Sequence, residues 1–321
     1  MDSLSYVNKI STGLFYIVIA VWWMIQMSKR YWYSKHRHVE FTSSVTYPCC
    51  NRCHRCSVEG ALKLTASLIL VLVGSYSLMY SPTTEVETLR HYQSIAQVTV
   101  FIIFSASGFV DILYQCNRRL VFPSLDYIVL LLAFTAQSLV SSYDVGDNSS
   151  WADITDSLMM FSAFGAAFTV LLELKQNDFI WFAILRAFFT LILGTWMINA
   201  TFILTLNTSH NGTSAVANAK SATKGAMNFN MDTANMHTNK SALLMEDMDW
   251  ENSPSVVLAM MYSWHCLANV IALGIIWIIT HRFVSRNKCC CIPIDEEISG
   301  RFENRVHFDY HFLAHLDSDL D

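Results

Sequence analysis

Four polar side chains stand in long apolar stretches of this sequence, where they could bind a small ligand or carry a proton. They are Gln97, Asp156, Asn199 and His265. Imidazole exchanges protons near neutral pH and binds polar ligands. Polar residues in apolar helices usually face the interior of a bundle or a cavity. These residues are therefore our candidates for a ligand site, with local hydrogen bonding of the lone histidine as the alternative.

Two charges of opposite sign, Glu173 and Arg186, flank the short connection between two apolar stretches. Either charge alone would be costly at this depth, whereas a pair neutralises both members. The sequence therefore predicts a structural ion pair.

Motifs that would indicate catalysis are missing from the sequence. There is no nucleophile elbow, P-loop, dinucleotide-binding fingerprint or HExxH sequence. Asp156 and Glu173 lie at opposite ends of one predicted helix, about 25 Å apart at ~1.5 Å per residue, so they cannot act as a catalytic pair. We expect no enzymatic activity and no catalytic residue.

Seven apolar stretches must position these residues. A hydrocarbon layer of ~30 Å needs about 20 apolar residues in a helix, and each stretch approaches or exceeds that length. The chain has 53% hydrophobic and 15% charged residues, which is too apolar for an ordinary soluble domain. We expect an all-α polytopic membrane protein, a bundle of seven transmembrane helices within residues 1–283, followed by a cytosolic acidic tail at 284–321. The stretches are Thr12–Met27, Ala61–Tyr80, Tyr92–Tyr114, Val121–Ser141, Ile154–Leu174, Phe179–Leu206 and Ser253–Thr280.

The distribution of Lys and Arg predicts the orientation of the bundle. These residues are frequent after the first, third and seventh stretches and rare after the second and fourth. Positive residues near spans stay in the cytosol, so the amino terminus is predicted to be lumenal or extracellular and the carboxyl terminus cytosolic. No cleavable signal precedes the first stretch, which would itself target the chain to the plasma membrane or endomembrane system.

Sequons and composition characterise the predicted lumenal connections. Asn148 and Asn211 are the favoured glycosylation sites, whereas the sequon at Asn199 lies inside a span and should be inaccessible. The connection at 207–252 is rich in Asn, Ser, Thr and Met and shows no apolar periodicity. We expect this connection to be disordered.

The predicted cytosolic segments contain three short motifs. Cys289, Cys290 and Cys291 follow the last span, where thiols at the membrane surface are typical of S-acylation. Tyr310 and Leu313 form a Tyr-x-x-Leu sequence, a form that clathrin adaptors bind as an extended strand. The CCNRCHRC cluster at residues 49–56 is a candidate for zinc binding or for S-acylation, with an unmodified cysteine run as the third possibility.

Five sequence segments together resemble the transmembrane protein 45 family, whose members have seven spans and no established biochemical activity. In chain order the segments are GLFYIVIAVWW, SASGFVDILY, FGAAFTVLLELK, LRAFFTLILGTWMINATFIL and MMYSWHCLANVIALGIIW. The resemblance covers all spans except the second and fourth, which match loosely. It implies a seven-helix fold and several histidines near the outer side.

This chain departs from the family pattern at those histidines. Gln97 stands where the family commonly has histidine, Ile154 and Asp156 stand at its HxH pair, and Asn8 lies near its amino-terminal histidine. Only His265 remains. Because Gln and Ile cannot replace imidazole as metal ligands, we expect no metal site and no cofactor in this chain.

The sequence therefore predicts a non-enzymatic scaffold or regulatory protein of the membrane. The alternative is a small-ligand or lipid-binding protein or transporter that uses the polar residues around His265. The expected partners are the lipid bilayer and, through the tail, a clathrin adaptor, and we expect no nucleic acid.

Overall fold

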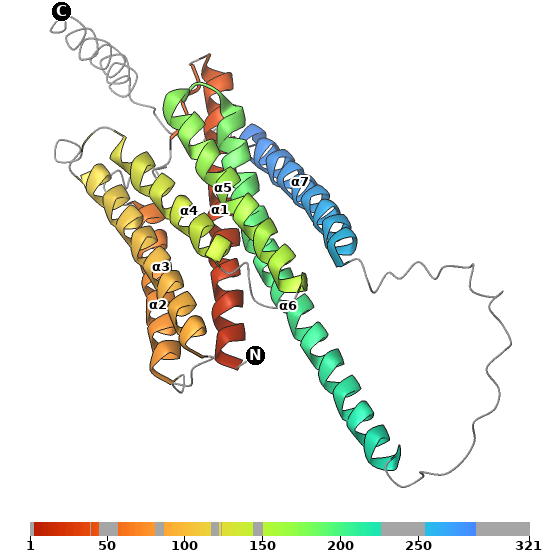
Figure 1. Cartoon of the computed structure of the whole chain (residues 1–321). Coiled ribbons are helices and arrows are strands. Elements are labelled where there is room, and N and C mark those ends of the chain that lie inside the picture. Colours follow the sequence, from red (N-terminus) through yellow and green to blue (C-terminus); the bar gives the residue numbers. More distant parts are fainter. Residues whose placement is uncertain are drawn as a thin grey trace, which may run out of the picture.

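Seven α-helices form the bundle in this computed structural model, and no strand occurs among the residues that the structure describes, which are 3–38, 40–44, 57–80, 87–116, 122, 124–143, 150–225 and 254–286 (Figure 1). The predicted all-α seven-helix bundle is confirmed. The helices are α1 (Ser3–Arg37), α2 (Val58–Tyr80), α3 (Glu87–Cys116), α4 (Leu125–Tyr143), α5 (Ser150–Lys175), α6 (Ile180–Gly225) and α7 (Pro254–Arg286).

Each helix contains a segment long and apolar enough to cross a membrane, with lengths from 18 to 31 residues. Large apolar side chains also cover the outside of the bundle, including Leu72, Phe161 and Trp264, which are 69%, 69% and 66% exposed. Such side chains belong next to lipid, where helices satisfy their own backbone polar groups. The chain is a multi-pass integral membrane protein.

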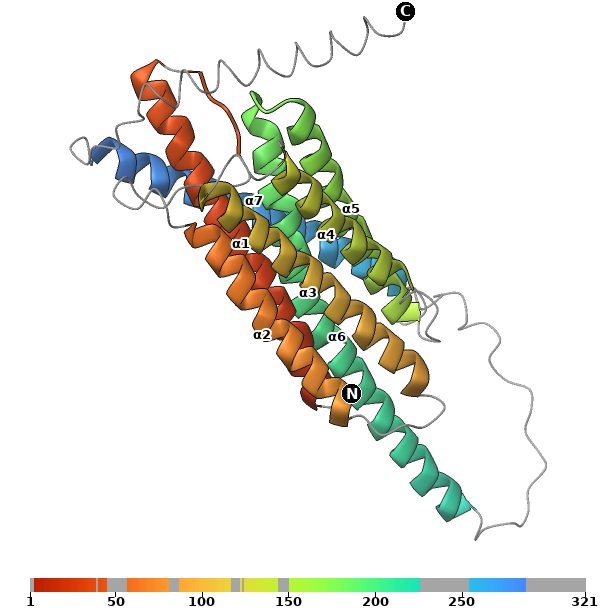
Figure 2. The same cartoon turned by 90° about the vertical axis from the view of Figure 1, so that its left-hand side faces the viewer.

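Six of the helices form a closed ring. Each of α1 to α6 packs against the helix before and after it, and α6 packs back against α1. The seventh helix, α7, lies outside this ring and contacts α1, α5 and α6 (Figures 1 and 2). Aromatic side chains fill the space between α1, α3 and α4, with T-shaped contacts of 5.4 Å between Phe15 and Phe104 and between Phe104 and Phe134.

Two pairs of helices approach closely through facing glycines. A Cβ built on Gly13 of α1 would lie 2.7 Å from the carbonyl oxygen of Gly194 on α6. A Cβ on Gly60 of α2 would lie 2.8 Å from the carbonyl oxygen of Gly108 on α3. Small residues at such crossings allow close packing where lipid provides no hydrophobic drive between helices.

The structure departs from the sequence expectation at α6. This helix has 46 residues and ends at Gly225, so residues 207–225 are helical in place of the disorder expected for them. No proline occurs between Ile180 and Gly225, and the segment beyond the span contains several alanines, which favour helix. Extending an existing helix also avoids the cost of nucleation.

Candidate functional site: a buried charge network

Six ionisable side chains meet at one end of the bundle. At this end, called here the charged end, α1, α3, α5 and α7 finish and α2, α4 and α6 begin. None of the six is more than 4% exposed. We call this set the charge network, and its members are Glu59 and Lys63 of α2, Asp111 of α3, Asp126 of α4, Glu173 of α5 and Arg186 of α6.

Lys63 joins two carboxylates. Its Nζ lies 2.8 Å from Oδ2 of Asp111 and 2.9 Å from Oε1 of Glu59. Glu59 and Lys63 are four residues apart, so they share one face of α2, and that face is turned toward α3. The ammonium is completely buried, and these contacts offset part of its desolvation cost.

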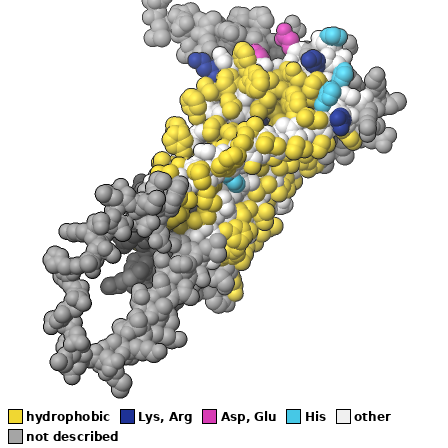
Figure 3. Space-filling view, turned by 90° about the vertical axis from the view of Figure 1, so that its right-hand side faces the viewer, with side chains coloured by type: hydrophobic (Ala, Val, Ile, Leu, Met, Phe, Trp, Pro, Cys, Tyr) yellow, Lys and Arg dark blue, Asp and Glu magenta, His cyan; other side chains and the backbone are white. Residues whose placement is uncertain are grey.

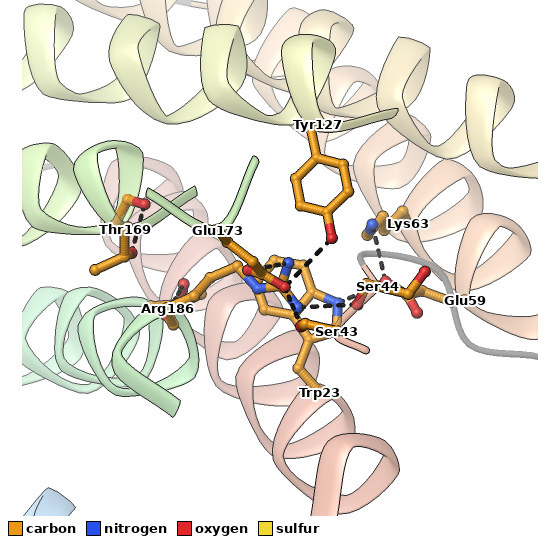
Figure 4. A network of polar contacts seen from close by, with 11 residues as sticks. Trp23, Ser43, Ser44, Glu59, Lys63, Tyr127, Thr169, Glu173 and Arg186 are labelled. Atoms are coloured by element: carbon orange, nitrogen blue, oxygen red, sulfur yellow. Dashed lines mark hydrogen bonds and ion pairs between the residues drawn. The ribbon is translucent and has the colours of Figure 1, made fainter. Parts of the chain in front are cut away.

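Arg186 pairs with Glu173 at the beginning of α6. Nη1 of the guanidinium lies 2.8 Å from Oε2 of the carboxylate, at an angle that makes the contact an ion pair rather than a linear hydrogen bond. Ser43 donates a hydrogen bond to Glu173, and the hydroxyl of Tyr127 donates a longer one of 3.5 Å. Arg186 also donates to the carbonyl oxygen of Ser44 at 3.4 Å (Figure 4).

Trp23 of α1 connects the two halves of the network. Its ring centre lies 5.2 Å from Nζ of Lys63 and 4.5 Å from Cζ of Arg186. Its indole N–H donates a hydrogen bond to Oε1 of Glu59 at 2.5 Å. One buried aromatic side chain therefore contacts both cations of the network. Such cation–π contacts are stronger where water is excluded.

Acids outnumber bases in the network. Four carboxyl groups stand against one ammonium and one guanidinium, so the fully ionised network would carry two excess negative charges. Asp126 lies in the first turn of α4, where the helix dipole favours a negative charge. The two cations are therefore the scarcer members, and each supports more than one neighbouring group.

Gln97 and His265, two of the four sequence candidates for a ligand site, lie in different hydrogen-bond networks. Gln97 donates to Oε1 of Gln137 on α4 at 3.3 Å, and that oxygen also accepts a bond from Tyr16. Nε2 of His265 lies 2.7 Å from the hydroxyl of Thr195 on α6. Both contacts join neighbouring helices, which is the packing role that polar side chains often have in membranes.

The other two candidates lie on α5 and α6, toward the end of the bundle opposite the charged end. Asp156 is buried on α5, next to Thr155, whose carbonyl accepts a bond from Trp196 of α6. Asn199 is half-buried on α6, one turn after Thr195. Asn269 of α7 donates to Thr195 at 3.2 Å, beside His265. This region is a hydrogen-bonded helix contact.

Sequence reasoning missed four of the six members of the charge network, which are Glu59, Lys63, Asp111 and Asp126. Glu59 lies before the predicted start of the second stretch at Ala61, whereas α2 begins at Val58 and includes it. The available signal was the spacing of Glu59 and Lys63, opposite charges one helical turn apart at the edge of an apolar stretch. Asp126 has no oppositely charged residue one helical turn away in the sequence, and its neighbours in the network lie on other helices.

Several sequence predictions lie outside the described residues. These are Asn148, the CCNRCHRC cluster, Cys289, Cys290, Cys291, Tyr310 and Leu313. Asn211 lies on the helical backbone of α6. No protein-family model matches the chain.

Proposed function

We propose that this chain is a non-enzymatic membrane scaffold or regulatory protein, similar to the transmembrane protein 45 family. The observation that supports this proposal is the buried charge network. It ties α1, α2, α3, α5 and α6 together at one level, and Tyr127 adds α4. Such a network favours a bundle of fixed shape that presents its surfaces to other molecules.

A transporter needs helices that separate and rejoin during each cycle. Separating α5 from α6 at the charged end would leave Glu173 and Arg186 buried without one another. Leaving one charge of a buried pair uncompensated costs about 3–5 kcal/mol, so the ion pair opposes such a separation. The geometry therefore favours a static role over a carrier cycle at this end of the bundle.

The second candidate is a small-ligand or lipid-binding protein or transporter that uses the polar residues around His265. The observation that favours it is the half-buried imidazole on α7, the helix outside the ring. The hydrogen bond between His265 and Thr195 favours the packing role instead. The substitution His265→Ala separates the two proposals, because a scaffold tolerates it and a carrier loses its flux.

Proton and potassium flux into liposomes tests the scaffold proposal. The full chain is reconstituted, a pH gradient or a potassium gradient is applied, and a pH-sensitive or potassium-sensitive dye is followed. We expect rates equal to those of protein-free liposomes. A faster flux that is lost in Asp111→Asn or in His265→Ala would overturn the proposal and identify a carrier.

Further proposals concern orientation and modification. The amino terminus is lumenal or extracellular, the charged end is cytosolic, and Asn148 and Asn211 carry glycans. The triple cysteine at 289–291 is acylated, and the Tyr310 motif is bound by a clathrin adaptor. The distribution of Lys and Arg along the chain supports the orientation on which the other proposals depend.

A further inference from the structure

A groove of about 360 Å³ lies between α1 and α7. Its α1 wall consists of Ile25 and Lys29, which are one turn apart. Its α7 wall consists of residues spaced three and four apart, which places them on one helix face. These residues are Ile276, Ile279, Thr280 and Phe283.

The groove has two polar lining residues, Lys29 and Thr280. Both α1 and α7 finish at the charged end, so residues with higher numbers lie closer to it. Ile25 is therefore deeper in the bilayer than Lys29, which is about 12 Å before the end of α1 at ~1.5 Å per residue. One cation in a mostly apolar groove matches a molecule with an anionic head and an apolar tail.

Lys29 has no acidic partner among the described residues. Lys63 and Arg186 form the ion pairs described above, and Lys29 is half-buried beside apolar side chains. A lysine in this position reaches toward the membrane surface and needs a counter-charge.

Aromatic residues join α1 and α7 beside the groove. Tyr31 and Trp32 of α1 contact Trp277 of α7 with ring centres 5.3 Å and 5.6 Å apart. Trp and Tyr concentrate at the level of lipid headgroups. Lys29 is within one turn of both α1 aromatics, so its ammonium can reach a lipid phosphate.

The face that carries α7 is mostly apolar, with Lys and Arg side chains, most of the visible His side chains and some acidic side chains gathered toward one end (Figure 3). His281 packs on Trp32 with ring centres 4.0 Å apart, and Arg282, the next residue, is exposed. The predicted orientation puts this end in the cytosolic leaflet, where acidic lipids are concentrated.

We propose that the groove between α1 and α7 binds an acidic phospholipid, with its phosphate on the ammonium of Lys29 and an acyl chain along Ile25, Ile276 and Ile279. This inference goes beyond the scaffold function and does not depend on it. A soluble phosphate would leave the apolar length of the groove uncovered. A zwitterionic lipid carries no net negative charge to compensate the charge of Lys29.

Native mass spectrometry of the purified full chain tests the site with phosphatidylserine and phosphatidylcholine of the same acyl chains. We expect the wild-type protein to retain phosphatidylserine preferentially. The substitution Lys29→Gln should lower that preference about five-fold, which corresponds to one lysine near a lipid phosphate. Lys9→Gln is the matched control, because Lys9 is also half-buried on α1 but lies at the opposite end.

A second variant tests the apolar part of the groove. Ile279 is 60% exposed, so Ile279→Trp should fold while filling the channel. We expect it to reduce retention of both lipids, whereas Lys29→Gln changes only the preference between them. Equal retention of the two lipids by the wild type, or equal losses in the Lys29 and Lys9 variants, would overturn the proposal. So would a covalent acyl group on Cys289, Cys290 or Cys291 that excludes added phosphatidylserine.

Discussion

Lys63 and Arg186 determine how the charge network is held together. Each cation is completely buried, each contacts a carboxylate at 2.8 Å, and both lie against the ring of Trp23. Carboxylates are in excess, so losing a cation leaves more uncompensated charge than losing an acid. Replacing Lys63 or Arg186 should therefore destabilise the protein more than replacing one of the carboxylates.

Lys63→Met should be among the most damaging single substitutions in the chain. It leaves Glu59 and Asp111 buried without their shared ammonium, and we expect a loss of about 3–5 kcal/mol in folding free energy. Thermal unfolding of the purified protein in detergent measures this loss. Asp126→Asn is the control, since it keeps the shape of the side chain and removes one excess charge. Equal losses in the two variants would contradict the charge balance described here.

At the level of helices, the glycine contacts set the distance between α1 and α6. Gly13→Ala would place a methyl group 2.7 Å from a backbone oxygen of Gly194, and backbone cannot rotate away as a side chain does. We expect a loss of about 1–3 kcal/mol, as for other overpacked sites. Thermal unfolding in detergent again provides the measurement.

The chain contains a matched control for this substitution. A Cβ on Gly274 of α7 would meet nothing within 4 Å. Gly274→Ala should therefore be neutral or stabilise by about 0.5–1 kcal/mol, because alanine favours helix over glycine. If both alanine variants unfolded at the wild-type temperature, the close crossing of α1 and α6 would be ruled out as a source of stability.

The seven helices could be predicted because their signal is local. A run of apolar residues of bilayer length determines a span whatever its neighbours are. Helix ends were harder to predict. α2 begins at Val58 because the hydroxyl of Ser57 caps it and accepts a hydrogen bond of 2.9 Å from the Gly60 N–H. The extension of α6 to Gly225 depends on an already formed helix.

The site was only partly predictable, for a different physical reason. Glu173 and Arg186 flank one short turn, so their sequence separation almost fixes their distance. Lys63 and Asp111 are 48 residues apart and meet only because α2 packs on α3. The contact of Gln97 could not be predicted for the same reason, because its partner Gln137 lies on a different helix.

For the whole molecule, glycan mapping tests which side of the membrane each connection occupies. We expect Asn148→Gln and Asn211→Gln each to increase the gel mobility of the expressed protein by removing one glycan. Asn199→Gln is the control, because its sequon lies within the membrane-crossing part of α6 and should carry no sugar. Unchanged gel mobility of both Asn148→Gln and Asn211→Gln, in protein that is recovered with the membranes, would contradict the proposed orientation.

The length of α6 also affects what can approach the membrane on that side. The apolar segment of this helix ends at Thr205 and the helix continues to Gly225. At ~1.5 Å per residue, the remaining turns extend about 30 Å, which equals the thickness of the hydrocarbon layer itself. Such a rigid spacer would hold a binding partner, an antibody or a fused reporter at a fixed height above the lipid surface.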